Sequence, residues 1–256
     1  MRLDTHLHVM LKPFMGRPAT EPETLLADLA RFNLDGGWIS SVEALTTRDL
    51  AVQKKSNDAL ADLVRKFPGR LAGLATVEPG EMEDAAREVE RCIQELGLIG
   101  IKLHPWLQAF SVTHPGLDLI MAAAGNLNVP VLFHDGTPPY ATPCQIAWLA
   151  RKHPRTKVIF GHCGLADLWP DAVAGARENP NIYLQPTGAP PMAIRAALNA
   201  LGPGRLLFGS DGGFGTARMI GYALAKYRSV LTDDMMDQIL IRNPPIIKQE
   251  TVDAKS

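Results

Sequence analysis

The chain has 256 residues, of which 46% are hydrophobic and 21% charged, and 26 basic residues nearly balance 27 acidic ones. This composition is that of a globular protein, and the net charge of −1 gives no general attraction to nucleic acid or to a membrane surface. The apolar runs are shorter than the roughly 20 residues that a membrane span needs. Three cysteines without a CxxC pair, and a start without a signal region, predict a cytoplasmic protein.

Short apolar runs alternate with longer amphipathic stretches along the chain. The strands that we expect lie at residues 2–9, 37–42, 70–77, 99–104, 129–134, 157–162, 181–185 and 205–211. Helical periodicity marks the stretches between them, among them 21–32, 47–66 and 81–96. Thr46 or Thr47, and Thr142 before Pro143, have the pattern of helix starts.

Eight such units in a chain of this length predict a single α/β domain over residues 1–256, a (β/α)8 TIM barrel. Residues 232–256 are expected to add a short C-terminal helix and a polar tail. An open doubly wound parallel sheet is the alternative.

Polar side chains recur at the predicted ends of these strands. His6 and His8 share one face of the first strand. The others end the fourth, fifth, sixth and eighth strands: His104, His134, His162 and Asp211. Their separations of 30, 28 and 49 residues correspond to one, one and two β–α units. We therefore expect all of them at the C-terminal mouth of the barrel, where active sites form.

This set of residue types indicates a metal centre. An HxH pair, a histidine from a neighbouring strand and a carboxylate can converge on a divalent metal and leave a position open for water. Each residue alone has a structural explanation, since a single strand histidine is usually a core residue and Asp211 could cap a helix. Together they favour a shared ion, because buried imidazoles and a carboxylate are costly without a partner. His114 and His153 each precede a proline and are expected on the surface.

Five motifs, in chain order, resemble the amidohydrolase superfamily. They are Asp4-Thr5-His6-Leu7-His8, Gly100-Ile101-Lys102-Leu103-His104-Pro105, Phe133-His134-Asp135-Gly136, Gly161-His162-Cys163-Gly164 and Leu207-Phe208-Gly209-Ser210-Asp211. The chain is most similar to the branch that contains aminocarboxymuconate-semialdehyde decarboxylase, resorcylate-type decarboxylases, and pyrone-dicarboxylate and sugar lactonases. The resemblance runs from the first strand to the eighth.

The resemblance implies a ligand set and a catalytic pair. The implied metal ligands are His6, His8, His134 and Asp211, and the implied catalytic residues are Asp211 and His162. The cofactor is then a divalent metal, with zinc preferred to manganese and one ion preferred to two.

Lys102 and His104 share a face of the fourth strand and form a possible additional site. Lys102 either pairs with a carboxylate such as Asp4 or, in carbamylated form, bridges two metals. The first of these is the preferred interpretation.

The preferred function is a metal-dependent hydrolase that uses activated water on an ester, lactone or amide-like bond of a small, carboxylate-bearing substrate. The reason is that the chain is short for this branch and leaves little room for the insertions that many decarboxylases carry. The alternative is a metal-dependent non-oxidative decarboxylase, which would use the same ligands. A second alternative is a metal-free lactonase or a non-catalytic binding barrel. The chain reads Gly212-Gly213-Phe214-Gly215 where many members have an aromatic residue and a proline. Because this loop faces the substrate, the resemblance does not identify the substrate.

Aromatic residues near the predicted strand ends could line an apolar substrate pocket: Trp38, Trp106, Tyr140 and Phe214. The expected partner is a small molecule, with neither nucleic acid nor membrane. The resemblance also implies a homodimer or a larger homo-oligomer.

Overall fold

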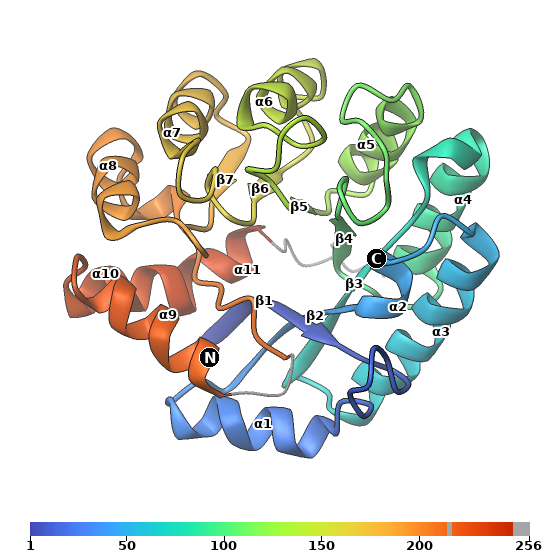
Figure 1. The fold of residues 1–256 in the computed structure, drawn as a ribbon, viewed down its shortest axis with the longest axis horizontal. Helices are drawn as coiled ribbons and strands as arrows, with labels where there is room; N and C mark the ends of the chain where they lie inside the picture. Colours follow the sequence, from blue (N-terminus) through green and yellow to red (C-terminus); the bar gives the residue numbers. More distant parts are fainter. Residues whose placement is uncertain (214–216, 248–256) are drawn as a thin grey trace, which may run out of the picture.

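The computed structural model describes residues 1–213 and 217–247. Parallel strands form a curled sheet with helices around its outside (Figure 1). The predicted α/β TIM-barrel-like fold is therefore confirmed. The sheet has the order β1 to β7, with bounds β1 (Leu3–Val9), β2 (Gly36–Ser41), β3 (Leu71–Ala75), β4 (Gly100–Leu103), β5 (Val131–Phe133), β6 (Val158–Phe160) and β7 (Ile182–Leu184).

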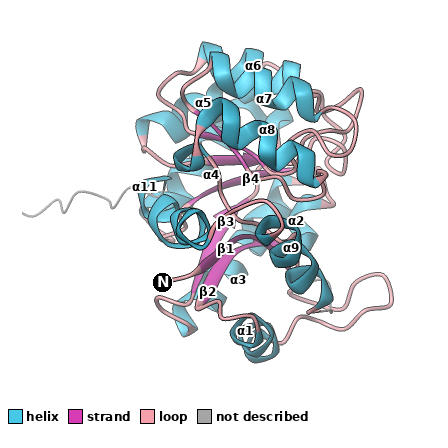
Figure 2. Ribbon diagram, turned by 90° about the vertical axis from the view of Figure 1, so that its left-hand side faces the viewer, coloured by secondary structure: helices cyan, strands magenta, loops and turns pink. Residues whose placement is uncertain are grey.

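The helices cover the outer face of the strands, as the side view in Figure 2 shows. Their bounds are α1 (Pro22–Arg31), α2 (Val42–Leu45), α3 (Leu50–Lys66), α4 (Met82–Gln94), α5 (Gly116–Asn126), α6 (Pro143–Lys152), α7 (Trp169–Glu178), α8 (Pro191–Leu201), α9 (Arg218–Arg228), α10 (Asp233–Asp237) and α11 (Asn243–Ile247). Two short 3-10 helices, η1 (Pro79–Glu81) and η2 (Pro203–Arg205), and a π-helical segment, η3 (Gln238–Arg242), complete the set. The predicted C-terminal extension is thus helical as far as the structure describes it, and residues 248–256 lie outside the described part. Among the described residues, no helix is both long enough and apolar enough to cross a membrane.

The eighth segment closes the barrel without forming a regular strand. Its first and last bridges pair Leu206 with Leu184 and Gly212 with Leu7. Between them, Thr5 N donates to Phe208 O at 3.0 Å. The prediction of a regular strand at 205–211 is wrong, because residues 203–205 form η2 and Asp211 has a left-handed φ of 58°. The segment nevertheless takes the predicted place between β7 and β1.

Helix starts follow the sequence signals in part. Thr142 forms the predicted N-cap of α6, with a complete capping box to Gln145. α3 begins instead after Asp49, whose carboxylate accepts from the N–H groups of the first turn. Thr46 is not a start, because it is the C-cap of α2.

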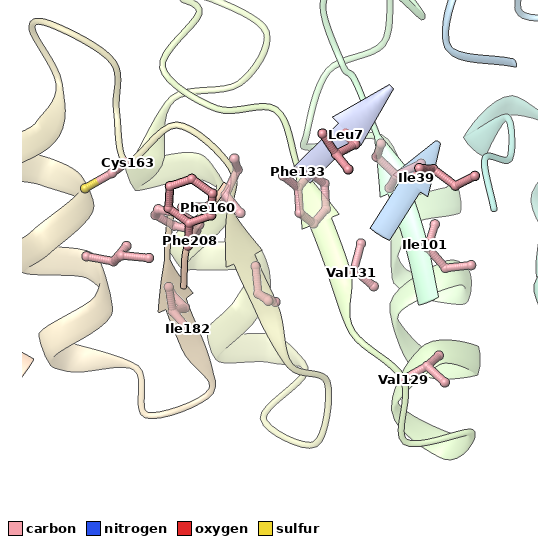
Figure 3. Close-up of a cluster of buried hydrophobic side chains, with 14 of the residues drawn as sticks. Leu7, Ile39, Ile101, Val129, Val131, Phe133, Phe160, Cys163, Ile182 and Phe208 are labelled. Carbon is pink, nitrogen blue, oxygen red and sulfur yellow. The ribbon is translucent and has the colours of Figure 1, made fainter. Parts of the chain in front are cut away.

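The hydrophobic core has two parts. The larger cluster fills the space between strands and helices, and Figure 3 shows some of it. Leu7 and Ile39 belong to the paired strands β1 and β2, and Ile101 and Phe133 belong to the paired strands β4 and β5. The smaller cluster consists of Trp38, Leu74, Leu132, Ile159 and Leu207. Leu132 precedes His134 by two residues and therefore shares its face, so this cluster lies inside the barrel beneath its mouth.

The expectation that Trp38 lines a substrate pocket is therefore wrong. Its ring is 2% exposed and belongs to the inner cluster. Trp38 is in the first half of β2, on the same face as Ser40, and so lies one layer below the mouth.

We predict that Trp38→Ala destabilises the fold by about 3–5 kcal/mol, because it leaves a cavity in a closed core. Urea unfolding followed by circular dichroism measures this change. A loss below about 1 kcal/mol would contradict the placement of Trp38 in the inner core.

Candidate active site and metal centre

The histidines at the strand ends lie next to one another at the mouth of the barrel. His6 and His8 belong to β1, His104 and His134 directly follow β4 and β5, and His162 lies two residues after β6. The separations of their ring centroids are 5.2 Å for His6–His8, 5.1 Å for His6–His162, 4.4 Å for His134–His162 and 3.8 Å for His104–His134. Sequence-distant strands thus bring five imidazoles to one place.

Three residues form a group that could hold a metal ion: His6, His162 and Asp211. Each offers one ligand atom, and these atoms lie within 4.8 Å of one another. Asp211 Oδ1 is 3.5 Å from His6 Nε2. Since transition metals bind such ligands at about 2.0–2.2 Å, small side-chain movements would let one ion contact all three.

His8 and His134 lie beside this group. His8 Nε2 is 3.0 Å from Asp211 Oδ1, and its Nδ1 is 3.0 Å from Ser40 Oγ. His134 Nε2 is 2.8 Å from Thr137 Oγ1. The structure therefore brings His8 to the carboxylate and directs one nitrogen of His134 to a hydroxyl, while His162 completes the group with His6 and Asp211.

Lys102 and His104, the two residues of the possible additional site, have different partners in the structure. Lys102 is fully buried, and its Nζ lies 2.9 Å from His6 Nε2. It does not pair with Asp4, whose Oδ1 accepts from the N–H groups of His6 and Ser210 and whose Oδ2 has no hydrogen-bond partner. His104 stacks its ring on His134 with an interplanar angle of 11°.

Burial keeps the imidazoles neutral. Desolvation lowers the pKa of His6 well below its usual value, and it lowers the pKa of His162 to about 4. Partial burial opposes ionisation of Asp211, but the hydrogen bond from His8 and the nearby imidazoles hold the pKa of this carboxyl below its usual range. Uncharged nitrogens and an ionised carboxylate are the donors that divalent transition metals take.

The hydrogen bonding around His6 also fits a cation. Burial lowers the pKa of Lys102 to about 8, so at neutral pH its ammonium donates to His6 Nε2. His6 Nε2 consequently carries a lone pair, and this nitrogen lies 3.5 Å from Asp211 Oδ1. A cation bound between His6 Nε2 and Asp211 Oδ1 would be attracted by both atoms. It would replace the hydrogen bond that Lys102 donates to His6.

The backbone of His162 is fixed by a carboxylate that the sequence analysis did not single out. Asp135 Oδ1 accepts from His162 N at 2.7 Å, and Oδ2 accepts from Gly164 N at 2.5 Å. Asp135 is fully buried, and desolvation raises its pKa to about 6, so it is ionised at neutral pH. The bonds hold a turn in which Cys163 and Gly164 both have positive φ, at 49° and 79°.

Ser40 and Thr187 were likewise missed. Ser40 contacts His8 Nδ1, and the carbonyl of Thr187 lies 3.1 Å from His162 Nδ1. Alternation along β2 was the available signal for Ser40, which follows the inward-facing Trp38 by two residues. A backbone carbonyl has no sequence signal.

Two of the predicted pocket residues lie in loops that follow strands. Trp106 is 53% exposed, with its ring centroid 6.1 Å from that of His104, and Tyr140 is 37% exposed. Phe214 lies outside the described residues.

A sequence profile of the amidohydrolase family matches residues 3–245. The chain belongs to the amidohydrolase family. The resemblance found from the five motifs is thereby confirmed.

Curated relatives of this family member include decarboxylases. It is 40% identical over 63 residues to a gamma-resorcylate decarboxylase of Polaromonas sp. (strain JS666), covering 25% of this chain and 19% of the relative. It is 27% identical over 177 residues to the 2-amino-3-carboxymuconate-6-semialdehyde decarboxylase of Dictyostelium discoideum, covering 56% and 48%. The matches thus span less than half of the length of these relatives.

Solved structures support the fold over nearly the whole chain. A dihydroxybenzoic acid decarboxylase from Polaromonas sp. JS666, with bound manganese and the inhibitor 2-nitroresorcinol, superposes with a TM-score of 0.76. The match covers 96% of each chain at 19% identity, so it establishes the shared fold.

We predict that Asp135→Asn lowers the affinity for Mn²⁺ by about 10–100-fold, because the residue orients His162. In the variant, the amide nitrogen of asparagine would face a backbone N–H and could not accept its hydrogen bond. The loss of this bond should also lower the free energy of unfolding by about 1–3 kcal/mol. Titration calorimetry and urea unfolding measure the two effects. Asp118→Asn is the matched control, since Asp118 forms partly exposed pairs with Lys152 and His153. Equal affinities for the two variants would refute the orienting role.

Proposed function

We propose that this protein is a metal-dependent, non-oxidative decarboxylase of small aromatic carboxylates. The observation that carries the proposal is the group of His6, His162 and Asp211 at the mouth of an amidohydrolase-family barrel. Decarboxylases among both the curated relatives and the structural neighbours favour this reaction over the hydrolysis that was preferred from the short chain length.

In this proposal His6, His162 and Asp211 hold one divalent cation, and His8 supports Asp211. Manganese becomes the first candidate, because a structural neighbour carries it, and zinc the second. When bound, the cation supplies positive charge that favours the ionised carboxylate and hydroxyl of a substrate.

The protein residues then bind the substrate and move a proton. Asp211 accepts a hydrogen bond from His8 Nε2, since an ionised carboxylate can only accept, and its side chain is 31% exposed toward the mouth. It can take the proton of a substrate hydroxyl and return it to the ring carbon that bears the carboxylate. The bond from that carbon to the carboxylate breaks, and its electrons restore the aromatic ring and leave the hydroxyl oxygen as a phenolate. CO₂ leaves, and the phenolate takes one proton from water.

Residues around the mouth of the barrel would contact the aromatic ring of the substrate. His104 and His134 stack there, and Trp106 and Tyr140 are partly exposed in the adjoining loops. Aromatic surfaces of this kind suit a planar substrate.

We predict that purified protein loaded with Mn²⁺ releases CO₂ from a hydroxybenzoate-type substrate, and that a chelator abolishes the release until Mn²⁺ is restored. A panel of aromatic carboxylates with CO₂ detection tests this, with lactones and esters assayed in parallel by a pH indicator. Acid production from lactones or esters without CO₂ release would replace the proposal with hydrolysis.

His6→Ala is expected to lose stoichiometric metal, which elemental analysis after dialysis measures. His114→Ala is the control, because His114 lies in a loop away from the group, where its Nδ1 accepts from Gly116 N. Retention of one equivalent of metal by His6→Ala would argue against the assigned ligands.

Asp211→Asn is expected to lower kcat/KM by at least about 10²-fold while the melting temperature and metal content are retained. An amide is nearly isosteric with the carboxylate but cannot take up the proton. If Asp211 only capped a helix, asparagine would serve almost equally well. Activity within about tenfold of wild type, or 1.4 kcal/mol, would exclude Asp211 as the proton carrier.

A further inference from the structure

Lys226 is a buried cation that lies outside the site described above. It belongs to α9 and is 7% exposed. Its Nζ donates to Pro186 O at 2.7 Å and to Ala189 O at 2.9 Å. Burial of an ammonium group costs free energy, and these two hydrogen bonds offset that cost. The same two bonds hold the loop after β7 against α9.

The two carbonyls flank Thr187, which contacts the site. The carbonyl of Thr187 lies 3.1 Å from His162 Nδ1, and its hydroxyl donates to Gly209 O at 2.8 Å. The next residue, Gly188, has a φ of +81°, and a Cβ there would lie 2.9 Å from Leu165 and 3.7 Å from His162 Nδ1. The loop is thus packed directly against the imidazole.

We propose that Lys226 is a positioning residue for His162. By holding the carbonyls on both sides of Thr187, it keeps the Thr187 carbonyl in place to accept from His162 Nδ1. A carbonyl can only accept, so this bond requires the proton on Nδ1 and leaves the lone pair on Nε2. The inference rests on the proposed function only in that His162 serves the metal centre.

Arg205 provides a matched comparison within the same β–α unit. Its guanidinium donates to Ile182 O at 2.7 Å and to the carbonyls of Ala176 and Asn179, each at 2.9 Å. Ile182 begins β7, whereas Pro186 and Ala189 follow its end. Lys226 and Arg205 therefore bind backbone carbonyls near opposite ends of one strand, and only the bonds of Lys226 flank a residue that contacts His162.

The experiment compares wild type, Lys226→Met and Arg205→Met by ¹⁵N NMR of the histidine side chains in metal-free protein, with His162 assigned from a His162→Gln spectrum. Mn²⁺ affinity is measured on the same samples by calorimetry. Wild type is expected to carry the His162 proton on Nδ1. Lys226→Met should lose this preference and bind Mn²⁺ about 10–100-fold more weakly. Arg205→Met should unfold at a lower temperature yet keep both the tautomer and the affinity.

Rescue by Lys226→Arg is the second expected result, since a guanidinium can also donate to two carbonyls. A wild-type His162 protonated on Nε2 would overturn the proposal even if Lys226→Met does not fold. Unchanged tautomer and affinity in Lys226→Met, or equal changes in Arg205→Met, would also overturn it. Neither readout requires turnover, so absence of decarboxylation would refute the proposed function while leaving this inference standing.

Discussion

The seam at which the barrel closes is also the place where its candidate metal centre forms. Asp211 N donates to His6 O at 3.0 Å, and His8 N donates to Gly212 O at 2.8 Å. These backbone bonds join the last segment to β1 and bring the Asp211 side chain against His6 and His8. The backbone bonds that close the barrel thus also place the Asp211 carboxylate beside the imidazoles, so a change that breaks this backbone pairing should also disturb the site.

The seam requires backbone conformations that a regular strand does not have. Asp211 has a left-handed φ of 58°, which Asp adopts more readily than most residues. Gly213 has a φ of +100°, and a Cβ there would lie 1.8 Å from His8 O, so any other residue would clash with β1. The irregularity turns the carboxylate toward the imidazoles.

The sequence predicted the parts of this arrangement that depend on spacing. Whole-unit separations of His104, His134 and His162 placed their strands correctly, and apolar periodicity located α1 and α4 within about two residues. The depth of Trp38 was harder to predict. Its side chain faces the inside of the barrel, but it lies near the start of β2, away from the carboxyl end that forms the mouth. The contacts of Asp135, Thr187 and Lys226 could not be predicted from the sequence, because each of these contacts joins loops or helices that only the tertiary fold brings together.

The reaction is harder to derive from the structure than the fold, because the same metal-ligand atoms suit both hydrolysis and decarboxylation. Neutral imidazoles and an ionised carboxylate can hold a cation that activates water or one that binds a substrate carboxylate. The burial that lowers the pKa of His6 and His162 serves both. What distinguishes the reactions is the substrate that the mouth admits, and this depends on loop residues such as Trp106 and Tyr140.

The proposed metal centre is tested most directly by a crystal structure of the Mn²⁺-loaded protein with anomalous diffraction data. One strong anomalous peak is expected at about 2.0–2.2 Å from ligand atoms of His6, His162 and Asp211. A peak held by other residues, with these three left uncoordinated, would contradict it.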